Sequence, residues 1–189
     1  MEEKRLFDIL KLYIAKYPSQ EVALAKKESG SWKKYSIQKY IEITNNISYA
    51  LIKLGIKKDD KVGIICNNRP EWNMLDMAIM QVGAVTVPIY PTISKEDYHY
   101  IINDCEVKLI VLEGQSVLQK IESVKDESPS LTGIYTIGTK SDYPTFDQLV
   151  EIGKSNPDPE ELKKREDNVD EKDCATIIYT SGTTGNPKG

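Results

Sequence analysis

Short apolar runs alternate with amphipathic segments along most of this chain. The runs are rich in Val, Ile and Leu and are only about five residues long, which predicts buried strands rather than helices. The predicted strands span residues 62–66, 85–89, 108–112, 133–137 and 175–179. Between them, apolar residues recur at helical spacing, with Pro70 opening one predicted helix and Ser94 with Asp97 capping another. This alternation is typical of parallel βαβ units.

The first part of the chain follows a different pattern. A helical stripe from Leu6 to Ile14 predicts a helix that ends near Tyr17. Residues 22–25 and 32–35 predict two strands, and the Ser-Gly-Ser turn between them indicates a hairpin. The clearest helical stripe follows, over residues 37–54, and Gly55 is a typical stop.

We therefore expect an α/β fold with a parallel-rich sheet flanked by helices. In such sheets, ligands bind beyond the carboxyl ends of the strands. Residues 156–173 carry a dense mixture of Lys, Arg, Asp and Glu, with Pro157 and Pro159. This composition favours a solvated, charged connector over a functional charge cluster.

Charge and cysteine content exclude several classes of function. The net charge of −4 argues against a nucleic-acid-binding protein, which usually carries a basic stripe. Cys66, Cys105 and Cys174 show no metal-ligand or disulfide spacing, so we expect small buried side chains in a reducing compartment. No apolar stretch is long enough for a transmembrane helix, and the N-terminus does not resemble a signal peptide.

Three other residues or regions are candidates for function. His99, the single histidine, has no evident catalytic partner, so we expect a structural role. Arg69 lies at a strand-to-helix turn, where it could meet an anion, and we favour a structural role there too. Trp72 and Tyr90 could line a substrate channel, but core packing is the preferred interpretation.

The most informative segment is the C-terminal one, residues 179–189, with the sequence YTSGTTGNPKG. It combines three glycines, four Ser or Thr hydroxyls and Lys188 directly after a predicted strand. Glycines allow backbone N–H groups to approach a ligand closely, hydroxyls add donors, and lysine adds a positive charge. This is the chemistry required to hold a polyphosphate.

Two other interpretations fit the segment less well. A flexible Gly/Ser/Thr linker would not normally combine an aromatic residue, spaced glycines and Pro-Lys-Gly. A Walker A loop places its lysine between Gly and Ser or Thr at the start of a helix, whereas Lys188 lies between Pro187 and Gly189.

This segment resembles the phosphate-binding signature of the adenylate-forming superfamily, which includes acyl-CoA synthetases, luciferases and peptide-synthetase adenylation domains. Upstream segments, residues 67–72, 83–85 and 87–92, are similar to the N-terminal region of long-chain fatty-acid–CoA ligases. The Tyr-Pro-Thr at residues 90–92 is typical of the long-chain branch. The resemblance covers the chain from about Ser36 onward.

The resemblance implies a fold, a reaction and a set of ligands. The chain would be the N-terminal part of the acyl-CoA synthetase large domain, truncated at the phosphate-binding loop. The complete protein would use ATP and Mg²⁺ to convert a long-chain fatty acid to an acyl-adenylate, and coenzyme A to form the thioester. The residues expected to bind the ATP phosphates are Thr180, Ser181, Gly182, Thr183, Thr184, Gly185 and Lys188.

The same resemblance places every catalytic residue beyond Gly189, so we expect no catalytic residue in this chain and no activity from it alone. The expected partners are the small-molecule substrates, with no nucleic acid. We expect a cytoplasmic protein, and leave open peripheral contact with the inner membrane and formation of a homodimer. The alternatives are a fatty acyl-AMP ligase, a peptide-synthetase adenylation module or a nucleotide-binding module without catalysis.

Overall fold

A computed structural model describes residues 5–180 and 185–189 of the chain. The chain divides into two compact units, each made of three segments. The first unit contains residues 1–55, 68–83 and 150–173, and the second contains residues 56–67, 84–149 and 174–189. Ser181, Gly182, Thr183 and Thr184 lie outside the described residues.

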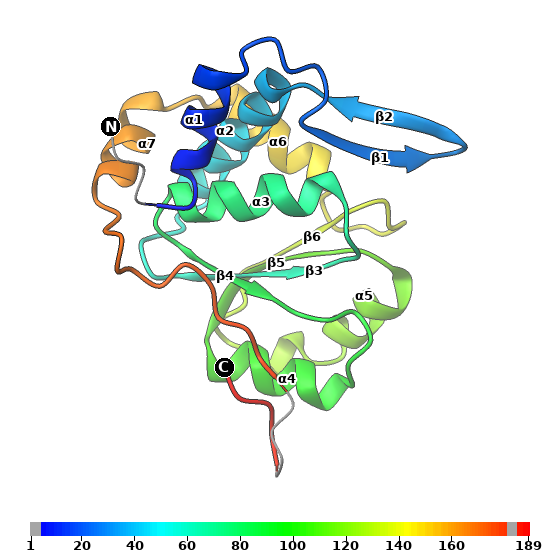
Figure 1. The fold of residues 1–189 in the computed structure, drawn as a ribbon. Coiled ribbons are helices and arrows are strands. Elements are labelled where there is room, and N and C mark those ends of the chain that lie inside the picture. Colours follow the sequence, from blue (N-terminus) through cyan, green and yellow to red (C-terminus); the bar gives the residue numbers. More distant parts are fainter. Residues whose placement is uncertain (1–4, 181–184) are drawn as a thin grey trace. The chain divides into compact units, whose positions relative to one another are not determined.

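The first unit is a group of helices with one β-hairpin (Figure 1). Helix α2 is central, and it contacts α1, α3 and α7. The hairpin contacts both α2 and α3. The elements are α1 (Asp8–Lys16), β1 (Leu24–Glu28), β2 (Ser31–Tyr35), α2 (Ile37–Lys53), α3 (Pro70–Gln81), most of α6 (Phe146–Ser155) and α7 (Pro159–Asp167).

The hairpin follows from its turn sequence. Glu28 pairs with Ser31, so the loop contains only Ser29 and Gly30. Both have positive φ, at 49° and 83°, the backbone conformation that tight two-residue hairpin loops require. The predicted hairpin is confirmed, although β1 begins and ends later than the apolar pattern indicated.

The charged segment at residues 156–173 contains a helix that the charge pattern did not predict. Asp158 caps α7 by accepting a hydrogen bond from the Glu161 N–H at 3.0 Å, and Pro159 begins the helix. Leu162 is buried, and Glu166 is buried beside Lys11 of α1 at 2.6 Å. Local caps and two inward-facing side chains therefore order part of a segment whose composition resembles a solvated connector.

The second unit is built around a four-stranded parallel sheet in the order β4-β3-β5-β6. Its elements are β3 (Lys61–Ile65), β4 (Val85–Pro88), α4 (Lys95–Asp104), β5 (Val107–Leu112), α5 (Gln115–Glu122), the short helix η1 (Lys125–Glu127), β6 (Gly133–Thr136) and the start of α6. The predicted α/β class is thus confirmed.

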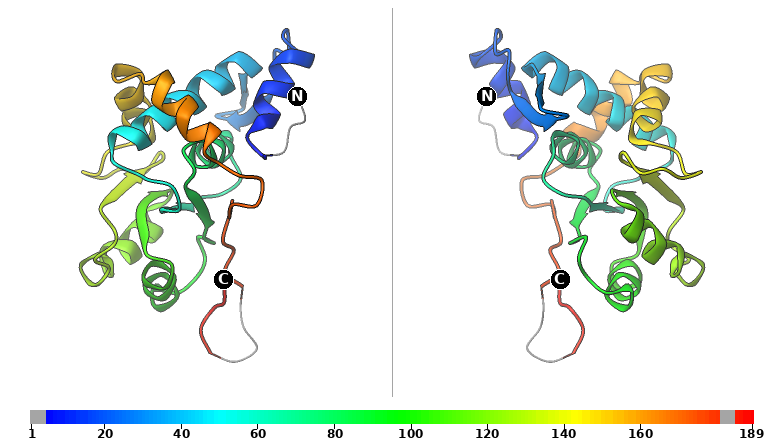
Figure 2. Two further views of the ribbon diagram at one scale, coloured as in Figure 1. Left: turned by 90° about the vertical axis from the view of Figure 1, so that its left-hand side faces the viewer. Right: turned by 90° about the vertical axis from the view of Figure 1, so that its right-hand side faces the viewer.

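Helices α4 and α5 lie on the same face of this sheet (Figure 1 and Figure 2). Alternate strand residues, such as Ile65, Ile110 and Leu112, pack with α4 and α5 in one buried apolar cluster. The predicted capping box is also present, with Ser94 and Asp97 bonding each other's backbone N–H groups. Among the described residues, none of the helices is both long and apolar enough to cross a lipid bilayer.

Candidate functional site

The chain approaches the candidate loop alongside strand β4. The Thr86 N–H donates to the Ala175 carbonyl at 3.1 Å, and the Ile177 N–H donates to the Thr86 carbonyl at 3.0 Å. The two segments run parallel. Residues after 178 therefore continue past the carboxyl end of β4, where ligands bind in sheets of this type.

The prediction of a continuous buried strand at residues 175–179 is wrong. Thr176 forms a single bridge with Thr86, and the Ile178 side chain is 54% exposed. Tyr179 is buried, at 8% exposure. The segment adds two backbone hydrogen bonds to the sheet edge and then leaves the sheet. The apolar run therefore predicted more strand pairing than the structure contains.

The structure brings the two ends of the loop together. Thr180 and Lys188 form an antiparallel bridge, in which each backbone N–H donates to the other's carbonyl, at 2.9 and 3.0 Å. Gly185 has φ of 83°, a conformation that glycine adopts without strain. Of the seven predicted phosphate-binding residues, the structure therefore describes these three, and the other four lie outside its described part.

Tyr179 anchors the base of the loop. Its hydroxyl donates to the Asp104 carboxylate at 2.5 Å, and its ring meets that of Tyr100 edge-on, with centroids 6.5 Å apart. Burial and the hydrogen bond with Asp104 raise the pKa of Tyr179, so the hydroxyl remains a donor at neutral pH. A Cβ at Gly189 would lie 2.9 Å from the Tyr179 ring, so close packing at the base requires glycine there.

Sequence reasoning did not identify Asp104 as part of this anchor. A signal was present, because Asp104 is the last residue of α4. A negative charge at a helix C-terminus is disfavoured by the helix dipole, which suggests a compensating contact elsewhere. That contact is made with Tyr179, at a separation of 75 residues along the chain.

We expect Tyr179→Phe to loosen the base of the loop. The substitution removes one hydrogen bond to a carboxylate that water can reach, which is worth about 1 kcal/mol. Backbone amides of Thr180 and Lys188 should then exchange with solvent about fivefold faster, as measured by hydrogen exchange. Asp104→Asn, which keeps an acceptor oxygen, should have a smaller effect. Unchanged exchange in Tyr179→Phe would show that the hydroxyl does not hold the loop.

A cavity of about 470 Å³ lies beside the loop, within the second unit. Its wall is mostly apolar, and Thr180 and Asp97 contribute polar groups. The lining residues come from the end of β4, helix α4 and the loop: Pro88, Ile89, Tyr90, Ile93, Asp97, Ile101, Ile178, Tyr179, Thr180, Gly185 and Pro187. A concave, mainly apolar site with a few polar groups is typical of small-molecule binding.

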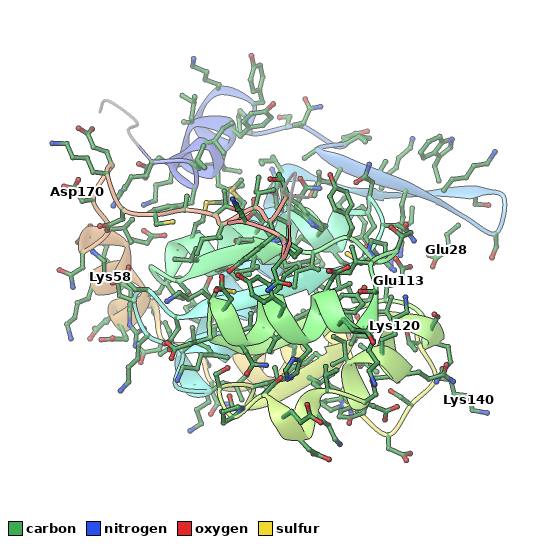
Figure 3. The ribbon with its side chains drawn as sticks, turned by 90° about the horizontal axis from the view of Figure 1, so that it is seen from below. Glu28, Lys58, Glu113, Lys120, Lys140 and Asp170 are labelled. Carbon is green, nitrogen blue, oxygen red and sulfur yellow. The ribbon has the colours of Figure 1, made fainter. Side chains whose placement is uncertain are left out.

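Two side chains hold the segment between β4 and α4 that forms one wall of the cavity. The Tyr98 hydroxyl donates to the Tyr90 carbonyl at 3.0 Å, and burial raises the pKa of Tyr98 to about 12. Lys120 of α5, labelled in Figure 3, donates to the Ile93 carbonyl at 2.7 Å. The Tyr90 side chain itself is 69% exposed, so its predicted core packing is wrong, and Trp72 is only half-buried.

The described loop residues fit the phosphates of a nucleotide better than they fit a metal ion. Thr180, Gly185 and Lys188 offer a hydroxyl, a backbone N–H in a positive-φ turn and an ammonium group. Among the described residues, no three His, Cys, Asp or Glu side chains form a group able to hold a metal ion.

The structure also places the remaining candidates. Arg69 binds Glu71 at 2.9 Å, as the structural interpretation predicted, and His99 lies 3.4 Å from Glu127 at the surface. None of the three cysteines forms a disulfide within the described part of the chain. Cys105 is buried and burial raises the pKa of its thiol, but Cys174 is exposed, so the expectation of buried cysteines is wrong for that residue.

Known proteins resemble the chain in sequence. The family model described as "AMP-binding enzyme" matches residues 11–189. A long-chain-fatty-acid–CoA ligase of Xenopus laevis, ACSBG2, is 39% identical over 173 residues, which are 89% of this chain and 23% of that protein. FadD15 of Mycobacterium bovis, also a long-chain-fatty-acid–CoA ligase, is 40% identical over 151 residues, covering 78% of this chain and 25% of that protein.

Solved structures share the fold. A fatty acyl CoA synthetase of Mycobacterium tuberculosis has a TM-score of 0.77 at 23% identity, and the match covers 98% of this chain and 34% of that one. A luciferase-like enzyme of the mealworm Zophobas morio has a TM-score of 0.78 at 21% identity, covering 96% and 41%. The chain thus spans about a quarter of the curated relatives it matches, and it belongs to the AMP-binding enzyme family.

Proposed function

We propose that this chain is the N-terminal part of an ATP-dependent long-chain fatty-acid–CoA ligase, and that residues 180–188 hold the ATP phosphates. The geometry of this loop is the main observation that supports the proposal. It leaves the sheet past the carboxyl end of β4, is closed by the Thr180–Lys188 bridge and borders a largely apolar cavity. The relatives named as long-chain-fatty-acid–CoA ligases support the substrate class.

The proposed chemistry follows from the groups in the loop. A carboxylate attacks the α-phosphorus of ATP, the bond to the bridging oxygen breaks, and pyrophosphate leaves with the negative charge. Hydroxyl and N–H donors and the Lys188 ammonium stabilise that developing charge most strongly if they are already in place. The anchored base of the loop, with Tyr179 bound to Asp104, favours such preorganisation. Bound magnesium would neutralise phosphate charge, and the thiol of coenzyme A would take the acyl group from the adenylate and release AMP.

The proposal has a consequence for the isolated chain. Its loop can hold phosphates, but the residues that bind adenine and ribose and complete catalysis would lie beyond Gly189. We therefore propose that residues 1–189 alone are inactive and that activity belongs to the full-length protein.

The test is ATP–pyrophosphate exchange by the full-length protein with a long-chain fatty acid. We expect exchange with fatty acids and none with amino acids, followed by thioester formation when coenzyme A is added. Lys188→Ala should lower the exchange rate about 100-fold, since it removes a charge aimed at the leaving group. Lys140→Ala, which changes an exposed lysine outside the cavity, is the matched control and should retain full activity.

Other outcomes would select an alternative. Exchange with amino acids would favour a peptide-synthetase module, and acyl-adenylate without thioester would favour a fatty acyl-AMP ligase. Nucleotide binding without pyrophosphate release would indicate a binding module. Exchange by residues 1–189 alone would contradict the assignment of catalysis to residues beyond Gly189.

A further inference from the structure

The hairpin of the first unit has two chemically different faces. In a β-hairpin, successive side chains point to opposite sides, and directly paired residues share a side. Lys27 pairs with Trp32, and Ala25 pairs with Lys34. These four side chains therefore form one face, which we call the Trp32 face. Leu24, Lys26 and Tyr35 belong to the other.

The Trp32 face points away from the rest of the unit. On the opposite face, Tyr35 is buried, and Lys26 binds Glu71 of α3 at 2.8 Å. On the Trp32 face the Trp32 side chain is 63% exposed, and Lys27 and Lys34 are exposed too. Neither of these two lysines forms an ion pair with any residue in the described part of the chain. The face thus presents a large aromatic side chain between two unpaired cations.

Exposed apolar side chains are concentrated in the same region. Of the nine large hydrophobic side chains exposed among the described residues, six lie within residues 6–32. Four of these six follow helical spacing along α1 and its flanking turns, and they form an apolar stripe: Leu6, Ile9, Tyr13 and Tyr17. Figure 1 shows α1 beside α2, and the chain continues from α1 into the hairpin, which extends away from it. Exposed apolar side chains gathered in one region usually mark an interaction site.

Local charge identifies the kind of partner. Residues 5–39 contain eight Lys or Arg and three Asp or Glu, in a chain whose net charge is −4. This region therefore carries an excess of positive charge, which attracts an anionic surface. Tryptophan prefers the boundary between water and hydrocarbon, where its ring is buried and its N–H remains hydrated. Lysine next to such a ring can reach acidic lipid headgroups.

We propose that the Trp32 face docks onto a lipid bilayer containing anionic phospholipids. Trp32 enters the headgroup boundary, and Lys27 and Lys34 bind acidic headgroups. A second copy of the chain is a poorer occupant, because a symmetric contact would bring like charges together. A nucleic acid is also disfavoured, because its binding surfaces carry a longer basic stripe than two lysines supply.

The test is sedimentation of the full-length protein with vesicles of phosphatidylcholine alone or mixed with phosphatidylglycerol. We expect binding to the mixed vesicles, weakening as salt is added. Lys27→Glu with Lys34→Glu should lower the partition coefficient at least about 30-fold, since each lysine contributes about 1 kcal/mol. Trp32→Ala should lower it about tenfold through lost apolar burial.

A matched control separates the local surface from overall charge. Lys95→Glu with Lys140→Glu changes the net charge by the same amount at exposed positions of the second unit, and should leave vesicle binding unchanged. Equal losses in both double variants would overturn the proposal, as would equal binding to both kinds of vesicle. Binding to an oligonucleotide in place of vesicles, or a dimer that Trp32→Ala dissolves, would assign the face to another partner. This assay measures binding to vesicles, so its result does not depend on the outcome of the ATP–pyrophosphate exchange assay.

Discussion

Replacing Glu71 with alanine is expected to destabilise the protein by about 3 to 5 kcal/mol. Glu71 is buried on α3 between Lys26 of the hairpin, at 2.8 Å, and Arg69, at 2.9 Å. The side chains of Lys26 and Arg69 are only 16% and 14% exposed. Removing the carboxylate would take away the partner that these two largely buried cations share, although Lys26 keeps Glu28 at 3.5 Å, and this loss is more costly than losing a surface pair.

Urea unfolding of the full-length protein would measure this effect. Glu42→Ala is the matched control, because the Glu42 pair with Lys39 is about half exposed on both sides, and such pairs contribute less than about 1 kcal/mol. Similar decreases in the free energy of unfolding in Glu71→Ala and Glu42→Ala would show that burial does not increase the contribution of the Glu71 ion pairs to stability. Glu71→Gln, which keeps an acceptor oxygen, should lower the free energy of unfolding by an amount between those of Glu71→Ala and Glu42→Ala.

The same carboxylate produces a defined pH dependence. Burial alone would raise the pKa of Glu71, but hydrogen bonds from Arg69 and Lys26 outweigh burial and lower it from 4.5 to about 2. A lowered pKa means that the folded state holds the ionised form more tightly than the unfolded state does. The ionised Glu71 therefore contributes fully to the free energy of unfolding above pH 4.5, and this contribution is lost as the pH falls toward 2. Unfolding curves between these values should be less pH-dependent in Glu71→Gln than in the parent protein.

Replacing Gly153 with alanine is expected to cost about 3 kcal/mol or more. Gly153 lies in α6 directly against α2, and a Cβ at this position would be 1.6 Å from the Asn46 carbonyl oxygen. A backbone atom cannot move aside as a flexible side chain can, so the helices would have to separate and lose packing between them. Thermal unfolding of the variant should show a clear fall in the melting temperature.

Gly133→Ala provides the comparison for this substitution. Its Cβ would meet the Leu109 side chain at 3.6 Å, an ordinary contact, and Gly133 does not require a positive φ. The change should therefore alter stability by less than about 1 kcal/mol. A loss in Gly153→Ala no larger than that in Gly133→Ala would mean that α6 and α2 tolerate a wider separation than the structure shows.

Much of the fold could be predicted because its signals are local. The two-residue hairpin turn, the Ser94 capping box and Pro70 at a helix start each depend on a few neighbouring residues, and all are present. Apolar runs located the four strands of the parallel sheet to within one or two residues. The candidate loop was likewise recognised from residues close together in sequence, although four of its seven proposed phosphate-binding residues lie outside the described part of the chain.

The sequence by itself thus determined the hairpin, the four strands of the parallel sheet, the parallel α/β class and the polar chemistry of the loop, since turn geometry and side-chain periodicity act over a few residues. Only the tertiary structure decided the pairing of Thr176 with Thr86, the bond from Tyr179 to Asp104 and the burial of Glu71 beside Lys26. These contacts join residues 45 to 90 positions apart. They depend on how whole elements pack. Burial and hydrogen bonding between distant residues are properties of the folded chain, and they produce no regular pattern in the sequence.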